Sequence, residues 1–289
     1  MIIPKKLNFV LIGFSVAVII TLLGIGIWNK HVKKLNTIGM VYIPAGWFWM
    51  GCAPNVFACN GTEPEEERPD EKPYHKVYLD AYYIDKNDVT VSEYKKCVEA
   101  GGCTEPHWNN CYIINSIGQY LGTVGSEFQK DNKPVVCVDW NQANAYCQWA
   151  GKRLPTEAQW EKAARGTDGR IYPWGNVWDE TRACFGQAST CAIGSYPQGA
   201  SPYGVMDMAG NVSDWCSDWY DYNYYNHSQD HNPQGPNSGY WHVLRGGGWF
   251  SLYDSVEDPD YLRSSSRGKG EPEEQDFSVG FRCVGQVSK

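Results

Sequence analysis

The chain has 289 residues, a formal net charge of −8 at pH 7, 14% aromatic residues and 20% charged residues. Such a length holds one large domain or two modest ones with a substantial core, and the negative charge argues against a general nucleic-acid binder. The aromatic-rich balance suits a loop-heavy core and a surface that recognises a ligand.

The first element is an apolar run, residues 9–28, which contains no charged side chain. A helix of about 20 residues spans a hydrocarbon core of about 30 Å. We therefore predict a single transmembrane helix preceded by a cytoplasmic tail, residues 1–8. A cleaved signal peptide is the alternative, but the run is long for one and no clear small-x-small site follows it.

Two features of the sequence, the flanking lysines and the cysteines, give opposite predictions for the orientation of this helix. Lys5 and Lys6 precede the run and Lys30, Lys33 and Lys34 follow it, so charge slightly favours a cytoplasmic domain. All eleven cysteines lie beyond the run, which indicates an oxidising compartment. We give the cysteines more weight and expect a cell-membrane protein with its domain on the extracytoplasmic side.

A polar linker, residues 29–37, leads into a domain that we place at residues 38–286. The domain begins with an apolar, strand-like run from Met40 to Met50. The acidic segment from Thr62 to Pro73 is expected to be a solvated loop, with cation binding as the alternative.

Three helices are indicated by capping residues. Asp139 precedes a helical pattern that ends at Gly151, and Thr156 with Gln159 forms a capping box for a second helix. That second helix should run through Arg165 and end at Gly166. Thr90 with Glu93 starts a third, weaker helix. From Tyr172 onward, Gly, Pro, Asn and Asp recur so often that long loops with short strands are expected.

Several strings occur together in one order along the chain. They are M-V-Y-I-P-A-G-W-F-W-M-G at 40–51, D-V-T at 88–90, G-K-R-L-P-T-E-A-Q-W-E at 151–161, Y-P-W-G-N at 172–176, M-A-G-N-V-S-D-W at 208–215, R-G-G-G-W at 245–249 and G-F-R-C at 280–283. In this order they resemble the formylglycine-generating enzyme or sulfatase-modifying-factor family. The resemblance implies a single α+β domain with a C-type-lectin-like fold, rich in loops, with short antiparallel strands and a few helices.

The oxidases of that family bind copper(I) through two cysteines between the G-G string and the closing G-F-R-C. This chain has no cysteine between Cys216 and Cys283. Ser251 stands at the first position, the second falls near Val256, and Gly248 replaces the family's serine. A hydroxyl does not replace a thiolate as a copper(I) ligand or in thiol exchange. We therefore expect no copper and no catalytic residue of the oxidase type.

The same resemblance places a calcium site in the string at 207–214. Its ligands would be the Asp207 carboxylate, the Gly210 carbonyl, the Val212 carbonyl and the Asp214 carboxylate. Calcium takes six to eight oxygen ligands in flexible loops, which these groups and waters would supply. The alternative is that Asp207 caps a turn and Asp214 lies in solvent.

The resemblance also implies a disulfide between Cys147 and Cys283, whereas the family's second bridge is lost at both ends, Ala164 and Ser264. Spacing alone suggests two local pairs, Cys52–Cys59 and Cys184–Cys191. The other five cysteines are an odd set, so one thiol is expected to stay free. They are Cys97, Cys103, Cys111, Cys137 and Cys216.

Two further groups of charged residues invite an assignment. Arg245, Arg263, Arg267 and Arg282 are expected to hold the closing segment through carboxylates and carbonyls. A general acid–base pair such as Glu161 with Asp214 or Asp218 stays open, because no pattern singles one out.

The sequence leads to three hypotheses about function. The first is a binding module for an unknown protein or small-molecule ligand, with a groove formed by Trp241, Trp249, Ser251, Tyr253 and Tyr261. The second is an enzyme of the same family whose chemistry does not need the copper cysteines. The third is an accessory subunit of an envelope complex. An enzyme should enclose perturbed acid–base groups in its groove, whereas a binder should show an open aromatic and polar surface.

Overall fold

The computed structural model describes residues 37–54, 68–114, 120–250 and 259–287. These residues belong to one compact unit, Leu35–Lys289. The predicted transmembrane run, residues 9–28, lies outside the described residues. Within the part of the chain that is described, no helix is both long enough and apolar enough to cross a membrane.

The domain is an α+β fold with short elements and long loops, as expected. The strands are β1 (Met40–Ile43), β2 (Gly46–Met50), β3 (His75–Leu79), β4 (Tyr82–Asp85), β5 (Tyr112–Ile114), β6 (Tyr120–Thr123), β7 (Ser213–Trp219), β8 (His242–Arg245), β9 (Gly268–Gly270), β10 (Val279–Gly280) and β11 (Val284–Gln286). The α-helices are α2 (Val91–Glu99), α3 (Trp140–Trp149) and α4 (Glu157–Arg165).

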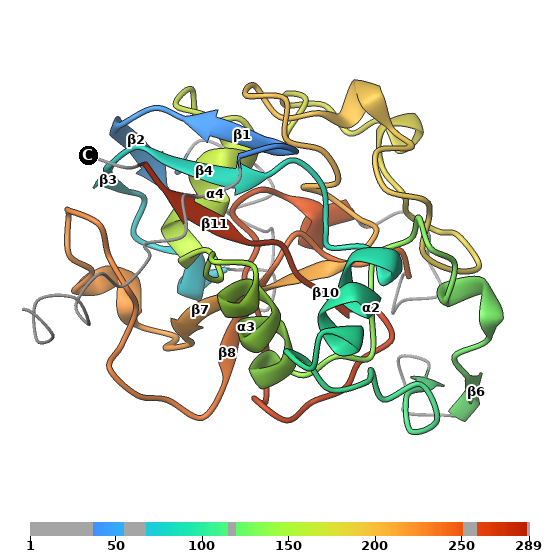
Figure 1. Cartoon of the computed structure of the whole chain (residues 1–289). Coiled ribbons are helices and arrows are strands. Elements are labelled where there is room, and N and C mark those ends of the chain that lie inside the picture. The colour runs from blue at the N-terminus through green and yellow to red at the C-terminus, as the bar shows by residue number, and fades with distance from the viewer. Residues whose placement is uncertain (1–36, 55–67, 115–119, 251–258, 288–289) are drawn as a thin grey trace, which may run out of the picture. The chain divides into compact units, whose positions relative to one another are not determined.

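Four small sheets organise these strands (Figure 1). One has the order β1-β4-β11, a second has the order β10-β7-β8-β9, and two are the hairpins β2-β3 and β5-β6. All pairs are antiparallel except β10 with β7, which run parallel. The expectation of antiparallel strands is therefore wrong for this pair, because the chain passes from β9 at one edge of the sheet to the opposite edge and pairs there with β7.

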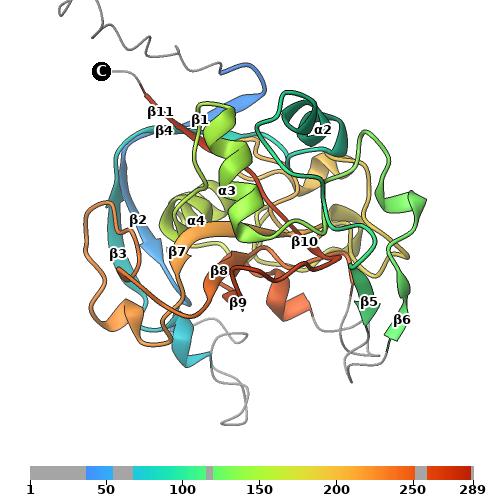
Figure 2. The same cartoon turned by 60° about the horizontal axis from the view of Figure 1, so that its bottom comes forward.

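The three helices begin where the capping residues predict. Thr90, Asp139 and Thr156 each accept a hydrogen bond from the backbone N–H three residues later, and each forms a complete capping box. Gly166 ends α4 with φ +71°. Helix α4 packs against β7 and β8 on one side and β2 and β3 on another, which places it at the centre of the domain (Figures 1 and 2).

The predicted bridge between Cys147 and Cys283 is confirmed, and it ties α3 to the strand that closes the domain. The pair Cys184–Cys191 is confirmed as well. In the odd set, whose pairing the sequence left open, Cys97–Cys103 and Cys111–Cys137 are bonded, and Cys216 is the one free thiol that the odd number predicted. Cys52 is disulfide-bonded, but Cys59 lies outside the described residues, so that pairing stays a prediction.

Candidate functional site

The closing segment is held in place by buried arginines, as the sequence suggested. Arg245, at the end of β8, donates to the carbonyls of Ser264, Ser265 and Ser266 and pairs with the Glu161 carboxylate of α4. The Arg245 side chain is buried, and because the guanidinium is charged, its hydrogen bonds to the Glu161 carboxylate and to the serine carbonyls are stronger than neutral ones. The three-serine stretch is thereby fixed beneath helix α4.

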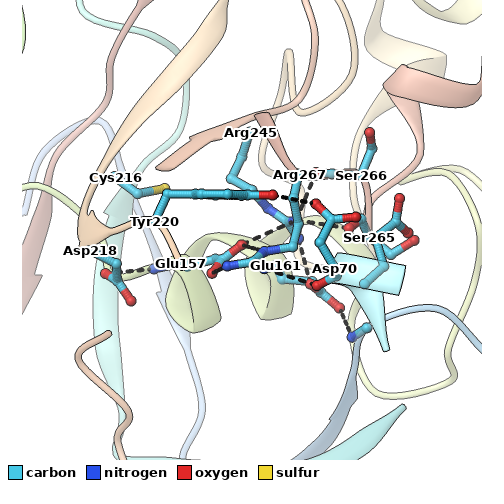
Figure 3. Close-up of polar contacts among 12 residues, drawn as sticks. Asp70, Glu157, Glu161, Cys216, Asp218, Tyr220, Arg245, Ser265, Ser266 and Arg267 are labelled. Atoms are coloured by element: carbon cyan, nitrogen blue, oxygen red, sulfur yellow. Dashed lines mark hydrogen bonds and ion pairs between the residues drawn. The ribbon is translucent and has the colours of Figure 1, made fainter. Parts of the chain in front are cut away.

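Arg267 continues this network of buried ion pairs (Figure 3). Its Nε and Nη2 donate to the two Glu157 oxygens at 2.7 and 3.0 Å, and its Nη1 donates to the Asp70 carbonyl at 2.9 Å. The guanidinium also lies over the rings of Tyr220 and Tyr225. Burial alone would raise the pKa of Glu157, but Arg267 and Arg245 outweigh it and hold that pKa below its usual value.

One expectation about the acidic segment is wrong. Glu71 is not solvated: it is 1% exposed, and both its oxygens accept from Arg263, at 2.7 and 2.8 Å. The reason is that Arg263 sits in the core and its charge needs a bidentate partner there. Asp70, the neighbour of Glu71, accepts from the Tyr220 hydroxyl at 2.9 Å. The other four acidic residues of this segment lie outside the described residues.

Below this network two titratable groups on β7 have strongly shifted pKa values. Burial, with the nearby charge of Glu157, raises the pKa of Asp218 to about 7. Asp218 accepts from the Glu157 backbone N–H and the Ser217 hydroxyl, both at 3.0 Å. Burial likewise raises the pKa of the Cys216 thiol well above its usual value. The Cys216 side chain is therefore a protonated thiol in the core.

A cavity of about 330 Å³ lies between the R-G-G-G string and the closing segment. Its walls come from β7, β8, β9 and the loops that join them, and they combine glycine backbone, hydroxyl groups and apolar side chains. The lining residues are Ser213, Leu244, Gly246, Gly247, Gly248, Phe250, Tyr261, Ser266, Arg267, Gly268, Lys269 and Ser278. The volume suits a small ligand or a short peptide side chain.

Two residues in this lining, Arg267 and Lys269, are cationic, and the charged group of each contacts residues that do not line the cavity. The Arg267 guanidinium is bound to Glu157 and to backbone carbonyls, and the Lys269 ammonium lies 4.2 Å from the Trp241 ring and 5.1 Å from the Tyr220 ring. Neither aromatic ring belongs to the cavity wall. The polar groups that the described residues offer to this largely apolar cavity are therefore hydroxyls and backbone groups.

The glycine string is required by close packing around this cavity. A Cβ on Gly246 would lie 2.9 Å from the Trp160 ring, and one on Gly247 would lie 2.6 Å from Leu262. Both positions also have φ between +66° and +96°, which side chains rarely adopt. The backbone can therefore form a thin wall between the core and the cavity only because these residues are glycine.

The predicted groove residues do not all come together. Tyr261 lines the cavity, whereas Trp249 is 2% exposed and packs on Phe128 and Phe277 in the core. Trp241 is half-buried beside Lys269, outside the cavity. Ser251 and Tyr253 lie outside the described residues. Sequence reasoning missed the serine hydroxyls and Phe250, although the neighbouring glycine string was the signal for a close backbone approach.

The predicted calcium loop has an unusual backbone. Asp207, Gly210 and Asn211 all have positive φ, at 56°, 80° and 67°. The Asp207 carboxylate accepts from the Gly194 N–H at 2.7 Å, and its backbone carbonyl faces Arg282. The loop is thus tightly coiled, and the Asp207 carboxylate ties it to a segment 13 residues earlier rather than capping a turn within the loop.

The Asp214 carboxylate is buried, contrary to the alternative that placed it in solvent. One oxygen accepts from Trp160 Nε1 at 2.7 Å and from Arg282 Nε at 2.6 Å, while Oδ1 is buried without a hydrogen-bond partner. An orphaned buried carboxylate oxygen fits a bound cation or water. Among the described residues, however, no three His, Cys, Asp or Glu side chains converge as a metal site. The two loop carbonyls would have to complete the ligand set.

Comparison with known proteins gives a consistent result. Residues 28–287 match the family model described as the sulfatase-modifying factor enzyme 1-like domain. A serine/threonine-protein kinase pkn1 of Chlamydia caviae is 37% identical over 251 residues, 85% of this chain and 37% of that protein. The formylglycine-generating enzyme of Streptomyces coelicolor is 33% identical over 87% of this chain and 90% of its own.

Among solved structures, the protein PvdO from Pseudomonas aeruginosa is similar with a TM-score of 0.66 and 26% identity, covering 86% of this chain and 94% of PvdO. The chain spans only a little over a third of the length of the chlamydial kinases that it matches. The part shared with the kinases is therefore this domain, whereas the similarity to the Streptomyces coelicolor enzyme and to PvdO covers nearly the whole of each of those proteins.

Proposed function

Because the chain belongs to the family of sulfatase-modifying factor enzyme 1-like domains, we propose that it is a family member that binds a ligand without oxidising it. In this proposal the domain is anchored in the membrane by residues 9–28 and lies on the extracytoplasmic side. Its ligand is a small molecule or a segment of another protein, held in the cavity beside the glycine string.

The observation that carries the proposal is the state of the two cysteines that flank the closing segment in sequence, Cys216 and Cys283. Cys283 is committed to Cys147, and Cys216 is a buried, protonated thiol. Between these two positions the sequence has no other cysteine. Copper(I) needs soft thiolate ligands, and serine hydroxyls do not replace them. The residues present at this site therefore do not fit copper, and no step through copper is assigned.

The composition of the cavity wall supports binding rather than acid–base catalysis. Among the described residues that line it, none is a carboxylate, a histidine or a cysteine. Asp218, whose pKa of about 7 suits proton transfer, is not a lining residue. The wall instead offers serine hydroxyls and glycine backbone groups together with the rings of Phe250 and Tyr261, which is the mixture that orients a ligand in a binding pocket.

A calcium ion in the loop at 207–214 is part of the proposal. Asp207, the Gly210 and Val212 carbonyls and the Asp214 Oδ1 atom would hold it, and the ion would neutralise buried carboxylates. Burial raises the pKa of Asp207 and of Asp214, so these groups gain from a neighbouring cation. The ion's role would be structural, because the loop leads directly into β7 and the cavity wall.

The decisive experiment compares oxidation with binding in the same purified protein. The full chain is titrated anaerobically with copper(I) and then given oxygen and a C-x-P-x-R peptide, with the Streptomyces coelicolor enzyme as the positive control. We expect no thiol-dependent copper binding and no formylglycine above the level of free copper. Turnover well above that level would overturn the non-oxidase proposal.

Binding is tested separately by ligand-observed NMR with neutral monosaccharides and short neutral peptides as probes. A variant in which Ser266→Phe fills the cavity is the control, because Ser266 lines the wall through a half-buried position. Probe signals that broaden with the native protein and not with this variant support the proposal. Equal behaviour of the two proteins with every probe would count against the cavity as the ligand site.

A further inference from the structure

One face of the domain, remote in sequence from the cavity, exposes large aromatic side chains. Trp47 and Trp49 on β2 are 40% and 42% exposed, although Phe48 and Met50 between and beside them are buried. We define the aromatic face by the side chains that surround these two tryptophans. It consists of Trp47, Trp49, Tyr74, Lys76, Tyr78 and His231.

The strand register explains why these rings gather on one side. In the β2-β3 hairpin, Trp47 is paired with Tyr78 and Trp49 with Lys76, and paired residues of an antiparallel hairpin share a face. The opposite face of the hairpin carries Phe48, Val77 and Leu79 into the core. The period of two therefore places every outward aromatic residue in a single strip.

The rings are held by contacts with one another rather than left mobile. Trp49 stacks on Tyr74 with centroids 5.0 Å apart, and Trp47 meets Tyr78 and His231 edge to face at 5.5 and 4.9 Å. The backbone of residues 230–232 hydrogen-bonds to Tyr78 on both sides, which fixes His231 against the strip. A rigid aromatic strip of this kind loses little conformational entropy when it is covered.

The charge of the strip differs from that of the chain as a whole. Strands β2 and β3 contain Lys76 and no carboxylate, in a chain with a net charge of −8. The Lys76 ammonium lies 5.3 Å from the Trp47 ring centroid. Two acids border the strip: Asp230 is hydrogen-bonded to His231 at 2.9 Å, and Asp80, directly after β3, to Asn232 at 3.2 Å. Tryptophan, tyrosine and lysine together are the side chains enriched where a protein meets the head groups of a bilayer.

The position of the strip in the chain favours a lipid surface as its occupant. Only the linker, residues 29–37, separates the apolar run from the domain, and nine extended residues reach at most about 30 Å. Strand β1 follows the linker at once, and β2 begins at Gly46. The linker would thus tether the domain within a short distance of the bilayer, and Trp47 and Trp49 follow the linker by only 10 and 12 residues.

We propose that the aromatic face lies against the head-group region of the membrane in which the chain is anchored. This inference rests on the membrane anchoring in the proposed function and adds a defined orientation to it. Trp47 and Trp49 would place their indoles at the level of the head groups and Lys76 would extend toward lipid phosphates. The domain would then present a fixed side to the rest of the compartment rather than tumble on its linker.

The test uses the full chain in lipid nanodiscs made from phosphatidylcholine or from its brominated form, which quenches nearby indoles. The double variant Trp47→Phe with Trp49→Phe keeps aromatic packing but removes both fluorophores. The matched control is Trp149→Phe, because Trp149 is 39% exposed on α3, outside the aromatic face. We expect the double variant to lose a large part of the bromolipid quenching and the control variant to retain it.

The outcomes separate this inference from the anchoring on which it rests. If the chain resists alkaline extraction from membranes but the double variant quenches as the native protein does, the orientation is wrong and the anchoring stands. If the chain is extracted into the soluble fraction, the anchoring itself fails. A third experiment tests the full chain in detergent for binding to an insoluble neutral polysaccharide. If the native protein and the Trp149→Phe control bind it, and the double variant does not bind it but is quenched as the native protein is, the aromatic face binds a glycan. That result overturns the lipid assignment.

Discussion

Arg267 and Glu157 form a bidentate ion pair between the segment before β9 and the first turn of α4, 110 residues apart in sequence. Both side chains are buried, and Arg267 also donates to the Asp70 and Asp221 carbonyls. One guanidinium thus joins three separate parts of the chain beside the candidate site.

Removing one partner of this pair should destabilise the domain strongly. For Glu157→Gln we expect a loss of about 3 to 5 kcal/mol in the free energy of unfolding, because it leaves the Arg267 charge buried without a counter-charge. Urea unfolding measures the change. Asp168→Asn breaks an ion pair with Arg170 that is partly exposed, and it should cost less than about 1 kcal/mol. A similar loss for both variants would show that burial does not set the strength of the Glu157 pair.

Asp218 should make stability fall as pH rises toward neutral. The pKa of Asp218 is raised to about 7 from a usual value of 3.8, so the folded state holds a proton that the unfolded state releases between these pH values. Folded stability from this group therefore declines as pH rises from about 4 to about 7, and the decline is complete above the folded pKa.

The variant Asp218→Asn cannot ionise and should escape this decline. The difference in unfolding free energy between variant and native protein should shift in the variant's favour by up to about 1.4 kcal/mol per pH unit over that range. Denaturant unfolding at a series of pH values gives the difference curve. A curve that stays flat would show that Asp218 is ionised in the fold at neutral pH.

Calcium should raise the thermal stability of the native protein. A ligand that binds only the folded state contributes about 2.7 kcal/mol at a hundredfold excess over its dissociation constant. We expect chelation to lower the melting temperature, and Asp207→Asn to abolish that response. Asp214→Asn is a poorer test, because Asp214 also pairs with Arg282 and its loss destabilises the fold without calcium. An identical melting curve with and without chelator in the native protein would remove calcium from the proposal.

The bridge between Cys147 and Cys283 should stabilise the domain more than the bridge between Cys97 and Cys103. The two cysteines of the first are 136 residues apart and those of the second 6 residues apart. Chain entropy then predicts losses of about 5 and about 2 kcal/mol when each pair is replaced by alanine. Equilibrium unfolding ranks the two variants. Equal losses would mean that native strain or residual structure in the unfolded chain outweighs loop length.

Placing cysteines at both of the family's copper-binding positions, 251 and 256, should create a copper(I) site, whereas a cysteine at only one of them should not. We expect Ser251→Cys with Val256→Cys to gain stoichiometric copper(I) binding, because two thiolates supply a linear site. Each single variant should bind no more tightly than the native protein. A competition titration with a copper(I) chelator measures the affinities. Tight binding by either single variant would reveal another sulfur ligand near the cavity.

Local signals in the sequence predicted local structure well. The caps at Thr90, Asp139 and Thr156 marked the starts of all three described α-helices, since a capping box needs only residues three apart. The bridge from Cys147 was predicted only because the family resemblance supplied a partner 136 residues away. Spacing alone does not select such a partner.

Long-range polar partners were not predictable in the same way. The arginines were expected to bind carboxylates, but the partner of Arg263 proved to be Glu71, 192 residues away in a segment whose acidic composition indicated a solvated loop. Trp249, expected in a groove, packs in the core because the preceding glycines turn the chain inward. A single sequence therefore shows which charged side chains need a partner of opposite charge, but the identity of that partner depends on the tertiary structure.

The accessibility of the Cys216 thiol distinguishes the folded domain from an incompletely folded chain. In the native domain this thiol is inaccessible and held protonated, so it exchanges with disulfides very slowly. In an oxidising compartment an incompletely folded chain would expose the same thiol, and the oxidant of that compartment would convert the thiols of two such chains to an intermolecular disulfide. Disulfide-linked dimers through Cys216 would therefore count the chains that failed to close before oxidation, and their abundance would rise with every substitution that slows closure of the core.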